Sequence, residues 1–386
     1  MMPSLLMIAP APVIVRGDVV LLDVKFAEGM AAQAAEWNGR MDCILWEGAE
    51  RIAFPVEMRR SDLPWGLVTL SPGADLPIDA GRDHDLVFAS ADMHETLMIA
   101  AQGRTPVVYT VEYSHRTRLD ILALETARNP LRRLRRRLWL EQQERRRKRA
   151  FQAAAAIQSN GYPCARAYAH LTSDMHLYLD NRMTPDRFVT DTELNGRLER
   201  LAQGKPLRIV YSGRLDPMKG TQDLVPLAKR LHGRGFAFEL DIFGDGILSA
   251  TMREQISALG LSDHVRLHGN VDFASELVPW QRQIPDIFLS CHRQGDPSCT
   301  YIESMGCGLP IVGYANEMWQ PLCEASRGGW HVPVADIGAL ADRIATLPRQ
   351  DIAQAAVAAA AFARAHDFQT EFTGRMAHLK RVAARS

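Results

Sequence analysis

The sequence predicts an α/β protein with two domains, each built on a doubly wound parallel sheet. The chain has 386 residues, which exceeds the size that one hydrophobic core usually serves, so two domains of roughly 150–200 residues are expected. Hydrophobic residues make up 47% of the chain, enough for two buried cores. Short apolar runs also alternate with helical patterns, which is typical of parallel sheets covered by helices on both faces.

In the first half, the apolar run at residues 5–10 predicts a strand, followed by a loop and a helix over residues 23–39. Further strands are expected in the runs DCILWEG, GLVTLSP, DLVFAS and PVVYTVEYS. After a long basic helix, the run AAAAIQSN at residues 153–160 predicts another strand. We therefore assign residues 1–190 to an amino-terminal domain.

A turn-rich polar segment at residues 179–206 is expected to separate the two halves. The alternation then restarts, with strands in LRIVYSG, FELDIFGDG, VRLHGNV, DIFLSC and PIVGY and helices between them. We assign residues 191–365 to this second domain. Residues 366–386 are amphipathic, and we expect them to form a helix that packs back on the first domain.

Composition excludes several classes of protein. The chain has 45 Lys and Arg against 45 Asp and Glu, so overall charge does not favour nucleic acid as a partner. The six cysteines show no CxxC pair and no zinc-ligand spacing, which indicates reduced thiols in a cytoplasmic protein and no metal site. The apolar start lacks a basic leader, so a first strand is expected there rather than a signal peptide. No run of eighteen apolar residues predicts a membrane span.

Ligands of open parallel sheets bind beyond the carboxyl ends of the strands, so the loops after strands of the second half should form one cleft. In YSGRLDPMKG, the cations Arg214 and Lys219 lie in such a loop, which is flanked by Gly213 and Gly220. Two cations on a glycine-permitted loop suit a diphosphate. Solvated surface cations are the alternative, since most Lys and Arg side chains are exposed.

The segment GDPSCTYIESMG at residues 295–306 predicts a helix that begins near Ser298. Free N–H groups, the positive end of the helix dipole and the hydroxyls of Ser298 and Thr300 suit a phosphate. Glu303 is a poor phosphate ligand but a good acceptor for two adjacent ribose hydroxyls. Its alternative role is that of a carboxylate that stabilises the helix dipole. Cations, dipole and carboxylate together describe a pocket for a nucleoside diphosphate.

The segments GRLDPMKG, FGDG, HGNV and DPSCTYIESMGCGLPIV resemble the carboxyl-terminal domain of GT-B glycosyltransferases, specifically glycosyltransferase family 4. This resemblance covers residues 206–345. LYLDNRMTPDRF also resembles the interdomain stretch of that family, which usually reads Pro-Asn-Gly-Val-Asp. The resemblance implies two Rossmann-like domains around an interdomain cleft. It also implies transfer of a hexose from a nucleotide-diphosphate donor, with retention of anomeric configuration and without a bound metal or other cofactor.

The resemblance implies roles for individual residues. Arg214 and Lys219 would hold the donor diphosphate beside Gly213. Ser298, Cys299 and Thr300 would offer backbone N–H groups to it. Glu303 would hold the ribose, and Val271 in the HGNV loop would lie against the base.

The sequence departs from the family pattern at two positions near the donor sugar. Gly295 stands where the family usually has a glutamate, and the adjacent Asp296 is the candidate replacement, or else a helix-capping carboxylate. The family often has a histidine after a strand of the first domain. Glu112 occupies that place here, with His115 three residues further on, and both are candidates.

Two further short patterns have open interpretations. The family's Gly-Gly turn is reduced to Arg16-Gly17-Asp18, so Gly17 is either a backbone contact to the diphosphate or acceptor, or an ordinary turn glycine. The sequence DHD at residues 83–85 matches the Asp-x-Asp pattern with which another class of glycosyltransferases binds Mg²⁺ or Mn²⁺. Because the pattern is short and common, we expect a solvated turn there.

Residues 129–152, NPLRRLRRRLWLEQQERRRKRAFQ, concentrate basic charge. Leu131, Leu134 and Leu138 recur at helical spacing among the arginines, and an amphipathic basic helix of this kind can lie on anionic lipid. The alternative is a solvated helix whose leucines pack on the first sheet. No recognition motif supports nucleic acid. We expect residues 131–149 to contact an anionic membrane surface.

These observations predict a retaining glycosyltransferase that moves a sugar from a nucleotide-diphosphate donor to a lipid or cell-envelope glycan acceptor. It would be cytoplasmic and peripheral on the inner face of the cytoplasmic membrane. Two alternatives stay open: a nucleotide-sugar epimerase on the same layout, and a nucleotide-sugar-binding protein that has lost catalysis. Release of nucleotide that depends on an added acceptor would distinguish the first function from the other two.

Overall fold

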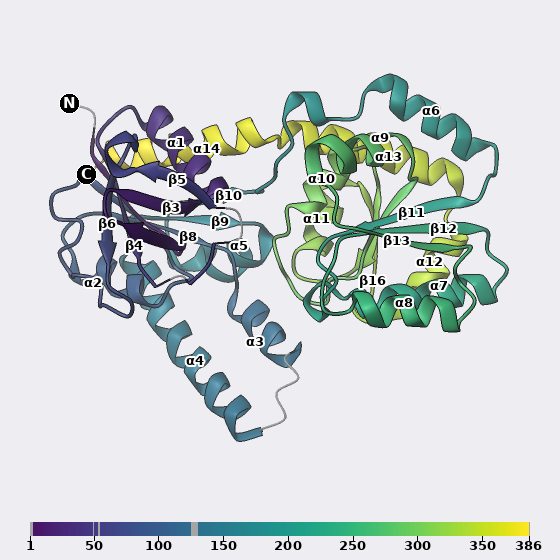
Figure 1. Cartoon of the computed structure of the whole chain (residues 1–386), viewed down its shortest axis with the longest axis horizontal. Coiled ribbons are helices and arrows are strands. Elements are labelled where there is room, and N and C mark those ends of the chain that lie inside the picture. The colour runs from purple at the N-terminus through teal and green to yellow at the C-terminus, as the bar shows by residue number, and fades with distance from the viewer. Residues whose placement is uncertain (1–2, 49, 53–54, 125–129, 386) are drawn as a thin grey trace.

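The computed structural model describes residues 3–48, 50–52, 55–124 and 130–385 of the chain. Figure 1 shows two α/β halves side by side along the long axis of the molecule. Each half contains one parallel sheet with helices packed around it. This arrangement confirms the predicted fold class of two doubly wound domains.

The first half has a seven-stranded parallel sheet in the order β10-β9-β8-β7-β1-β4-β6. Its strands are β1 (Leu5–Ile8), β4 (Met41–Trp46), β6 (Gly66–Leu70), β7 (Leu86–Ser90), β8 (Val107–Val111), β9 (Ala156–Asn160) and β10 (Met175–Tyr178). Its helices are α1 (Val24–Trp37), α2 (Ile99–Gln102), α3 (His115–Leu124), α4 (Pro130–Ala153) and α5 (Tyr162–Tyr168). In β1, Leu5 and Met7 belong to one buried cluster, and Leu6 and Ile8 belong to another. Burial on both faces explains why β1 is a continuous apolar run.

The segment between the first strand and α1 is a small antiparallel sheet, so the predicted loop is wrong. β2 (Val13–Arg16) and β3 (Val19–Asp23) form a hairpin, and β5 (Pro55–Arg59) pairs with β3. Gly17 lies in the two-residue turn of this hairpin with a φ of +63°, a conformation that glycine adopts without strain. The alternating apolar residues of VIVRGDVVLLD are the sequence signal for the hairpin.

The second half has a six-stranded parallel sheet in the order β13-β12-β11-β14-β15-β16. Its strands are β11 (Leu207–Ser212), β12 (Phe238–Phe243), β13 (Val265–Gly269), β14 (Ile287–Ser290), β15 (Ile311–Tyr314) and β16 (Gly329–Val332). Its helices are α6 (Asp191–Ala202), α7 (Leu224–Gly233), α8 (Ser249–Ala258), α9 (Val278–Gln283), α10 (Thr300–Gly306), α11 (Trp319–Ser326), α12 (Ile337–Thr346) and α13 (Arg349–Ala365).

The predicted turn-rich separator at residues 179–206 contains helix α6, so the prediction is wrong over residues 191–202. The helix begins with a capping box in which the Thr190 hydroxyl accepts the N–H of Glu193 and the Glu193 carboxylate accepts the N–H of Thr190. This reciprocal pair satisfies two N–H groups at the helix start. Thr-x-x-Glu is the local sequence signal for the helix.

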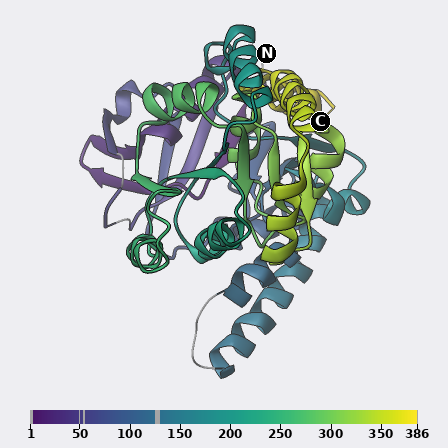
Figure 2. The same ribbon diagram turned by 90° about the vertical axis from the view of Figure 1, so that its right-hand side faces the viewer.

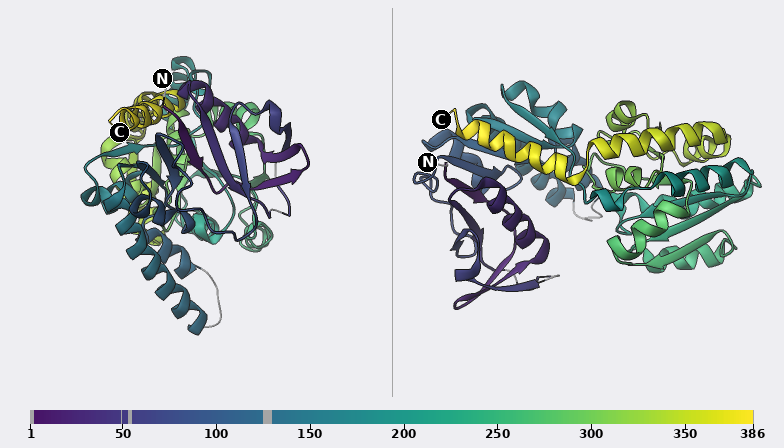
Figure 3. Two further views of the ribbon diagram at one scale, coloured as in Figure 1. Left: turned by 90° about the vertical axis from the view of Figure 1, so that its left-hand side faces the viewer. Right: turned by 90° about the horizontal axis from the view of Figure 1, so that it is seen from above.

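Two segments cross between the halves and hydrogen-bond to each other. The Asn181 side chain donates to the carbonyl of His366 at 2.9 Å, and the N–H of Phe368 donates to the carbonyl of Met183 at 2.9 Å. Helix α14 (Phe368–Ala383) then packs against β10 and α1 of the first half, as the right-hand view of Figure 3 shows. The first strand β1 and the last helix α14 therefore belong to the same half.

Helix α4 extends away from the body of the first half beside α3 (Figures 1 and 2). Its inner end is buried through Ala150 and Phe151, whereas its outer end is exposed. Among the described helices, none combines the length and the apolar character that a membrane span requires.

Candidate functional site

Lys219 and Asp296 meet at the carboxyl ends of β11 and β14. Lys219 ends the short 3-10 turn η5 (Pro217–Lys219) after β11, and Asp296 lies between β14 and α10. The Lys219 ammonium donates to the Asp296 carboxylate and to the Ser298 hydroxyl, the latter at 3.4 Å. Both side chains of the ion pair are 12% exposed. Three residues that the sequence predicts to bind the donor therefore lie in contact.

The environment keeps Asp296 ionised. Burial raises the pKa of its carboxyl, but the positive charge of Lys219 and the hydrogen bond from it outweigh that effect and lower the pKa below its ordinary value. His292 lies buried behind the pair, and burial together with the charge of Lys219 lowers its pKa to about 3, so its ring is neutral. Its Nδ1 is 3.2 Å from the hydroxyl of Tyr301 in α10. The positive charge of Lys219 is thus held in place by fixed partners.

The start of α10 lies beside this pair. The N–H of Ser298 donates to the carbonyl of Asp296 at 2.8 Å, so it is not free for a ligand as expected from the sequence. Across the described residues, no hydrogen bond engages the backbone N–H of Cys299 or of Thr300. The Ser298 hydroxyl also donates to the hydroxyl of Thr300 at 3.1 Å. Two free N–H groups next to two hydroxyls and a lysine form a surface that suits an anion.

The remaining donor-side candidates surround this surface. Arg214 is 67% exposed, and its Nε is 3.6 Å from the Asp216 carboxylate. Gly213 has a φ of +153°, and its carbonyl lies 2.0 Å from where a Cβ on Gly244 would be, so the two loops approach closely through glycines. Val271 follows β13 and packs against a buried cluster of the second half.

Glu303 has a partner that the sequence analysis missed. Arg182, in the interdomain segment, binds both carboxylate oxygens: Nε donates to Oε1 at 2.7 Å and a terminal nitrogen donates to Oε2 at 3.0 Å. The Glu303 side chain is 7% exposed and that of Arg182 is 42% exposed. The same guanidinium stacks on the ring of Phe273, with its central carbon 3.6 Å from the ring centre.

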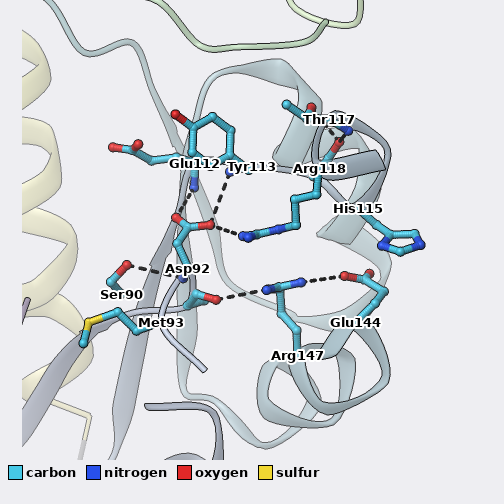
Figure 4. A network of polar contacts seen from close by, with 12 residues as sticks. Ser90, Asp92, Met93, Glu112, Tyr113, His115, Thr117, Arg118, Glu144 and Arg147 are labelled. Carbon is cyan, nitrogen blue, oxygen red and sulfur yellow. Dashed lines mark hydrogen bonds and ion pairs between the residues drawn. The ribbon is translucent and has the colours of Figure 1, made fainter. Parts of the chain in front are cut away.

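Glu112 lies on the first half, at the carboxyl end of β8. Figure 4 shows how its backbone is fixed: the N–H groups of Glu112 and Tyr113 donate to the Asp92 carboxylate at 2.9 and 3.4 Å. Arg118 donates to the same carboxylate. Asp92 and Arg118 are therefore positioning residues for the loop that carries Glu112, and the sequence analysis singled out neither.

The carboxyl group of Glu112 titrates near neutral pH although its side chain is exposed. Desolvation and the negative charges of Asp92, Asp180 and Asp296 raise its pKa to about 7, against a lowering effect from Arg375. These charges come from the first half, the interdomain segment, the second half and α14. A carboxyl group with a pKa near 7 is able both to accept and to donate a proton at neutral pH.

The loop with Glu112 is also tied to helix α4. Arg147 of α4 donates to the carbonyl of Ala91 at 3.1 Å and pairs with the buried Glu144 at 2.8 Å (Figure 4). The hydroxyl of Tyr168 donates to the same Glu144 carboxylate. The buried ion pair connects the inner end of α4 with the residues beside Asp92.

Three candidates from the sequence have other surroundings. His115 begins α3, and its Nε2 is 3.2 Å from Glu141 of α4, so its ring is turned away from Glu112 in Figure 4. A Cβ built on Gly17 would meet no atom within 4 Å, so the hairpin turn faces open space. In the DHD pattern, Asp85 accepts hydrogen bonds from Ser4. Across the residues that the structure describes, no group of three His, Cys, Asp or Glu side chains could hold a metal ion.

The two halves touch directly beside Asp296. The Ser114 hydroxyl donates to the Glu317 carboxylate at 3.1 Å, and the Thr117 hydroxyl donates to the carbonyl of Gly295 at 3.3 Å. A Cβ on Gly295 would lie 2.9 Å from Glu317 and 3.1 Å from Thr117. The glycine at this position therefore permits the close approach of the two halves.

The sequence contains a local signal for some of the residues that were missed, but not for their proximity to Glu112. Arg182 stands where the family's interdomain stretch usually has glycine, so the departure was visible in LYLDNRMTPDRF. Asp92 and Asp180 follow β7 and β10, where ligand-binding residues of parallel sheets are expected. Their proximity to Glu112 depends on strand order, which the local pattern does not contain.

Residues 197–364 match the family model described as glycosyl transferases group 1. The protein named "Putative colanic acid biosynthesis glycosyltransferase WcaL" of Salmonella typhimurium is 30% identical over 157 residues, which are 39% of this chain and 38% of that relative. The GDP-mannose-dependent alpha-(1-6)-phosphatidylinositol monomannoside mannosyltransferase of Mycolicibacterium smegmatis is 29% identical over 135 residues, 33% of this chain and 35% of that protein. The matched part thus spans less than half of the length of each relative.

Solved structures match the whole chain. The sucrose-phosphate synthase of Thermosynechococcus elongatus superposes with a TM-score of 0.65 at 16% identity and covers 100% of both chains. Anabaena HepE in complex with UDP superposes with a TM-score of 0.62 at 14% identity, covering 97% of this chain and 98% of that one. The chain therefore has the GT-B fold, with two Rossmann-like halves.

Proposed function

We propose that this protein is a glycosyltransferase that moves a sugar from a nucleotide-diphosphate donor to a lipid or cell-envelope glycan acceptor. The observation that carries the proposal is the contact of Lys219 with Asp296 and Ser298 at the start of α10. This cation, the free N–H groups of Cys299 and Thr300, and Glu303 line one edge of the second sheet. That set suits the diphosphate and ribose of one nucleotide.

Sugar transfer breaks the bond between the anomeric carbon and the diphosphate oxygen. Negative charge grows on the leaving diphosphate while positive charge grows on the sugar ring. Cations that are fixed before reaction stabilise the diphosphate without reorganising. Lys219 is held in this way, and Arg214, which is 67% exposed on the same loop after β11, would add a second cation. In this proposal the two side chains supply the charge, so no metal is needed.

Asp296 and Glu112 take the sugar side of the reaction. Asp296 is ionised and lies next to Lys219, the cation that would bind the diphosphate. Its carboxylate would therefore accept a hydrogen bond from a hydroxyl of the donor sugar. Glu112 lies on the other half and has a pKa near 7, so it would accept the proton of the acceptor hydroxyl. We propose transfer with retention of configuration, which the family resemblance of the second half supports.

Names of the relatives support the acceptor class. WcaL is named for colanic acid biosynthesis, and the mycobacterial relative for mannosylation of a phosphatidylinositol mannoside. HepE was solved with UDP. For this chain we propose a nucleoside diphosphate sugar as donor and an envelope glycan or lipid as acceptor.

We further propose that α4 places the enzyme on the inner face of the cytoplasmic membrane. Leu131, Leu134 and Leu138 are 75%, 55% and 61% exposed, so the alternative in which these leucines pack on the first sheet is wrong. Residues 130–153 contain nine Arg and one Lys against two Glu. Exposed leucines among cations suit an anionic bilayer. The hydrogen bond from Arg147 to the carbonyl of Ala91 connects α4 to the loop beside Asp92. It would fix the distance between that loop and the membrane surface.

The test measures nucleotide release from UDP-, GDP- and ADP-sugars, with and without a bacterial lipid extract as acceptor. Release that needs the acceptor is expected for at least one donor. Lys219→Ala is expected to lower the rate by about a hundredfold or more, because it removes charge stabilisation of the leaving group. Lys229→Ala, an exposed lysine on α7, is the matched control and should leave the rate unchanged.

Two results would contradict the proposed function, and a third would contradict the role of Lys219. Conversion of the donor without an acceptor would favour the epimerase alternative. Tight donor binding with no turnover in any lipid fraction would favour a binding protein without catalysis. A Lys219→Ala enzyme with the wild-type rate would remove the assigned role of that cation.

A further inference from the structure

Arg182 occupies the position next to the carboxylate that would read the ribose. It comes from the interdomain segment, 121 residues from Glu303 in sequence, yet it binds both oxygens of that carboxylate. A bidentate guanidinium–carboxylate pair has a fixed plane as well as a favourable charge. The orientation of the Glu303 carboxylate is therefore determined by Arg182.

The backbone and the side chain of Arg182 are themselves held in place. Its carbonyl accepts a hydrogen bond from Arg187 at 2.6 Å. The Asn181 side chain binds the carbonyls of Leu179 and His366 and the N–H of Met183, so residues on both sides of Arg182 are fixed. Phe273, at the start of the π-helical turn η7 (Phe273–Leu277), covers one face of the guanidinium. The pair is thus held from several sides where the chain crosses between the halves.

The pair leaves hydrogen-bonding capacity for a ligand. A carboxylate has about four acceptor positions, and Arg182 uses two of them, so two remain for two adjacent hydroxyls. A guanidinium has five N–H donors, of which the pair with Glu303 uses two. The Arg182 side chain is 42% exposed, so part of it is accessible to a ligand. A ligand bound beside the pair would donate to Glu303 and accept from Arg182.

We propose that Arg182 is a specificity-determining residue of the nucleotide site, which orients Glu303 to bind both ribose hydroxyls and adds donors of its own to the nucleoside. The inference rests on the proposed function, because it takes the ligand to be a nucleoside diphosphate. The chain then selects ribonucleotides over 2′-deoxyribonucleotides through the Arg182–Glu303 pair. In this chain an arginine takes the place of the glycine that is usual in the interdomain stretch of family 4.

The experiment compares UDP, GDP and ADP with their 2′-deoxy forms by calorimetry on the full chain. For the base that binds, the ribonucleotide is expected to bind about tenfold or more tightly than its 2′-deoxy form, because a hydrogen bond to a charged group is lost. Arg182→Gly should weaken ribonucleotide binding about tenfold and bring the ratio of the two affinities close to one. Arg182→Lys keeps the charge but not the planar fork, and should not restore the ratio.

Glu303→Gln and the double variant Arg182→Gly/Glu303→Gln show whether the two residues act together. If Arg182 acts through Glu303, the double variant has the same affinity ratio as Glu303→Gln alone. The double variant also removes the unpaired buried carboxylate, so it covers the case in which Arg182→Gly fails to fold. Arg234→Gly is the matched control, since Arg234 is 40% exposed and pairs with a carboxylate elsewhere on the second half. It should keep the wild-type ratio.

The two proposals fail in different ways. If the wild-type chain binds none of the nucleotides, the proposed function is wrong and this inference falls with it. If a nucleotide binds and Arg182→Gly keeps the ribo-to-deoxy ratio, only the role of Arg182 is wrong. Tighter binding by Arg182→Gly would also overturn it, because Arg182 would then compete with the ribose for Glu303.

Discussion

Glu112 shows how the fold changes the chemistry of one residue. The carboxyl group belongs to an exposed side chain, but Asp92, Asp180 and Asp296 surround it with negative charge after partial desolvation. These three carboxylates come from separate parts of the chain, and only the folded arrangement of the two halves brings them near. The ionised form of Glu112 is therefore disfavoured in the folded protein relative to the unfolded chain.

This shift predicts a pH-dependent effect of Glu112→Gln on stability. The pKa rises from 4.5 in the unfolded chain to about 7 in the folded protein, so the folded protein binds more protons between these values. Wild-type stability should fall, relative to the variant, as pH rises through this window. Above pH 7 the variant should be more stable by roughly 1 kcal/mol, a value reduced for solvent screening, which corresponds to a Tm about 2–4 °C higher.

Thermal unfolding at pH 8 and pH 5 measures this difference. The gain in Tm should be largest at pH 8 and much smaller at pH 5, where wild-type Glu112 is mostly protonated when folded. Glu28→Gln, an exposed carboxylate on α1, controls for loss of a charge as such. An equal Tm difference at the two pH values would show that the cleft does not raise the pKa of Glu112.

Helix α4 is buried at one end and exposed at the other. Its inner end is fixed by Phe151, Ala150 and the Arg147–Glu144 pair, while the outer turns expose leucines and arginines. Trp139 is 48% exposed and contacts His94 edge to face, which marks the point where the helix leaves the body. An exposed apolar stripe of this kind is costly in water unless another surface covers it.

Vesicle flotation tests whether lipid covers the stripe. Wild type should float with vesicles that contain anionic lipid and not with neutral ones. Changing Arg135, Arg136 and Arg137 together to Gln should lower partitioning by up to about a hundredfold, because each cation near the surface contributes about 1 kcal/mol. Changing the exposed Arg51, Arg59 and Arg82 to Gln removes the same charge elsewhere and should have little effect. Equal flotation of the two triple variants would remove the assigned role of α4.

The molecule as a whole depends on contacts between the halves at Gly295. A side chain there would overlap Glu317 and Thr117, which belong to the second and first halves respectively. The distance to Glu317 is too short for a real Cβ, and the tight contact with Thr117 requires that neighbour to move as well. Packing extra atoms into such a contact usually costs 1–3 kcal/mol or forces the structure to shift.

Gly295→Glu would introduce the residue that is usual in the family that this chain resembles. We expect the substitution to reduce activity rather than increase it. The new side chain should separate the halves, weaken the Ser114–Glu317 contact and lower turnover by about tenfold or more. Small-angle scattering should then report a larger radius of gyration. Gly196→Ala is the control, since a Cβ there meets no atom within 4 Å. Increased turnover by Gly295→Glu would show that the halves tolerate the larger residue.

Much of the fold follows from local sequence. Inner strands such as β1, β7, β14 and β15 are buried on both faces, so each is a short apolar run that stands out between helical patterns. The loop glycines and prolines mark where strands end, which is enough to place Lys219, Asp296 and Ser298 at one sheet edge. Short elements with a weak pattern, such as the β2–β3 hairpin and α6, were missed because hairpin and capping signals extend over only a few residues.

The sequence by itself determined the two-sheet architecture and most of its strands, though not β10 or β16, because periodicity and turn chemistry are local properties. Only the tertiary structure decided which of these residues meet. The pairing of Arg182 with Glu303, the three carboxylates around Glu112 and the fit of Gly295 between the halves all join residues that are distant in the chain. These contacts form because strand order and the packing of one half against the other bring distant parts of the chain close together in space.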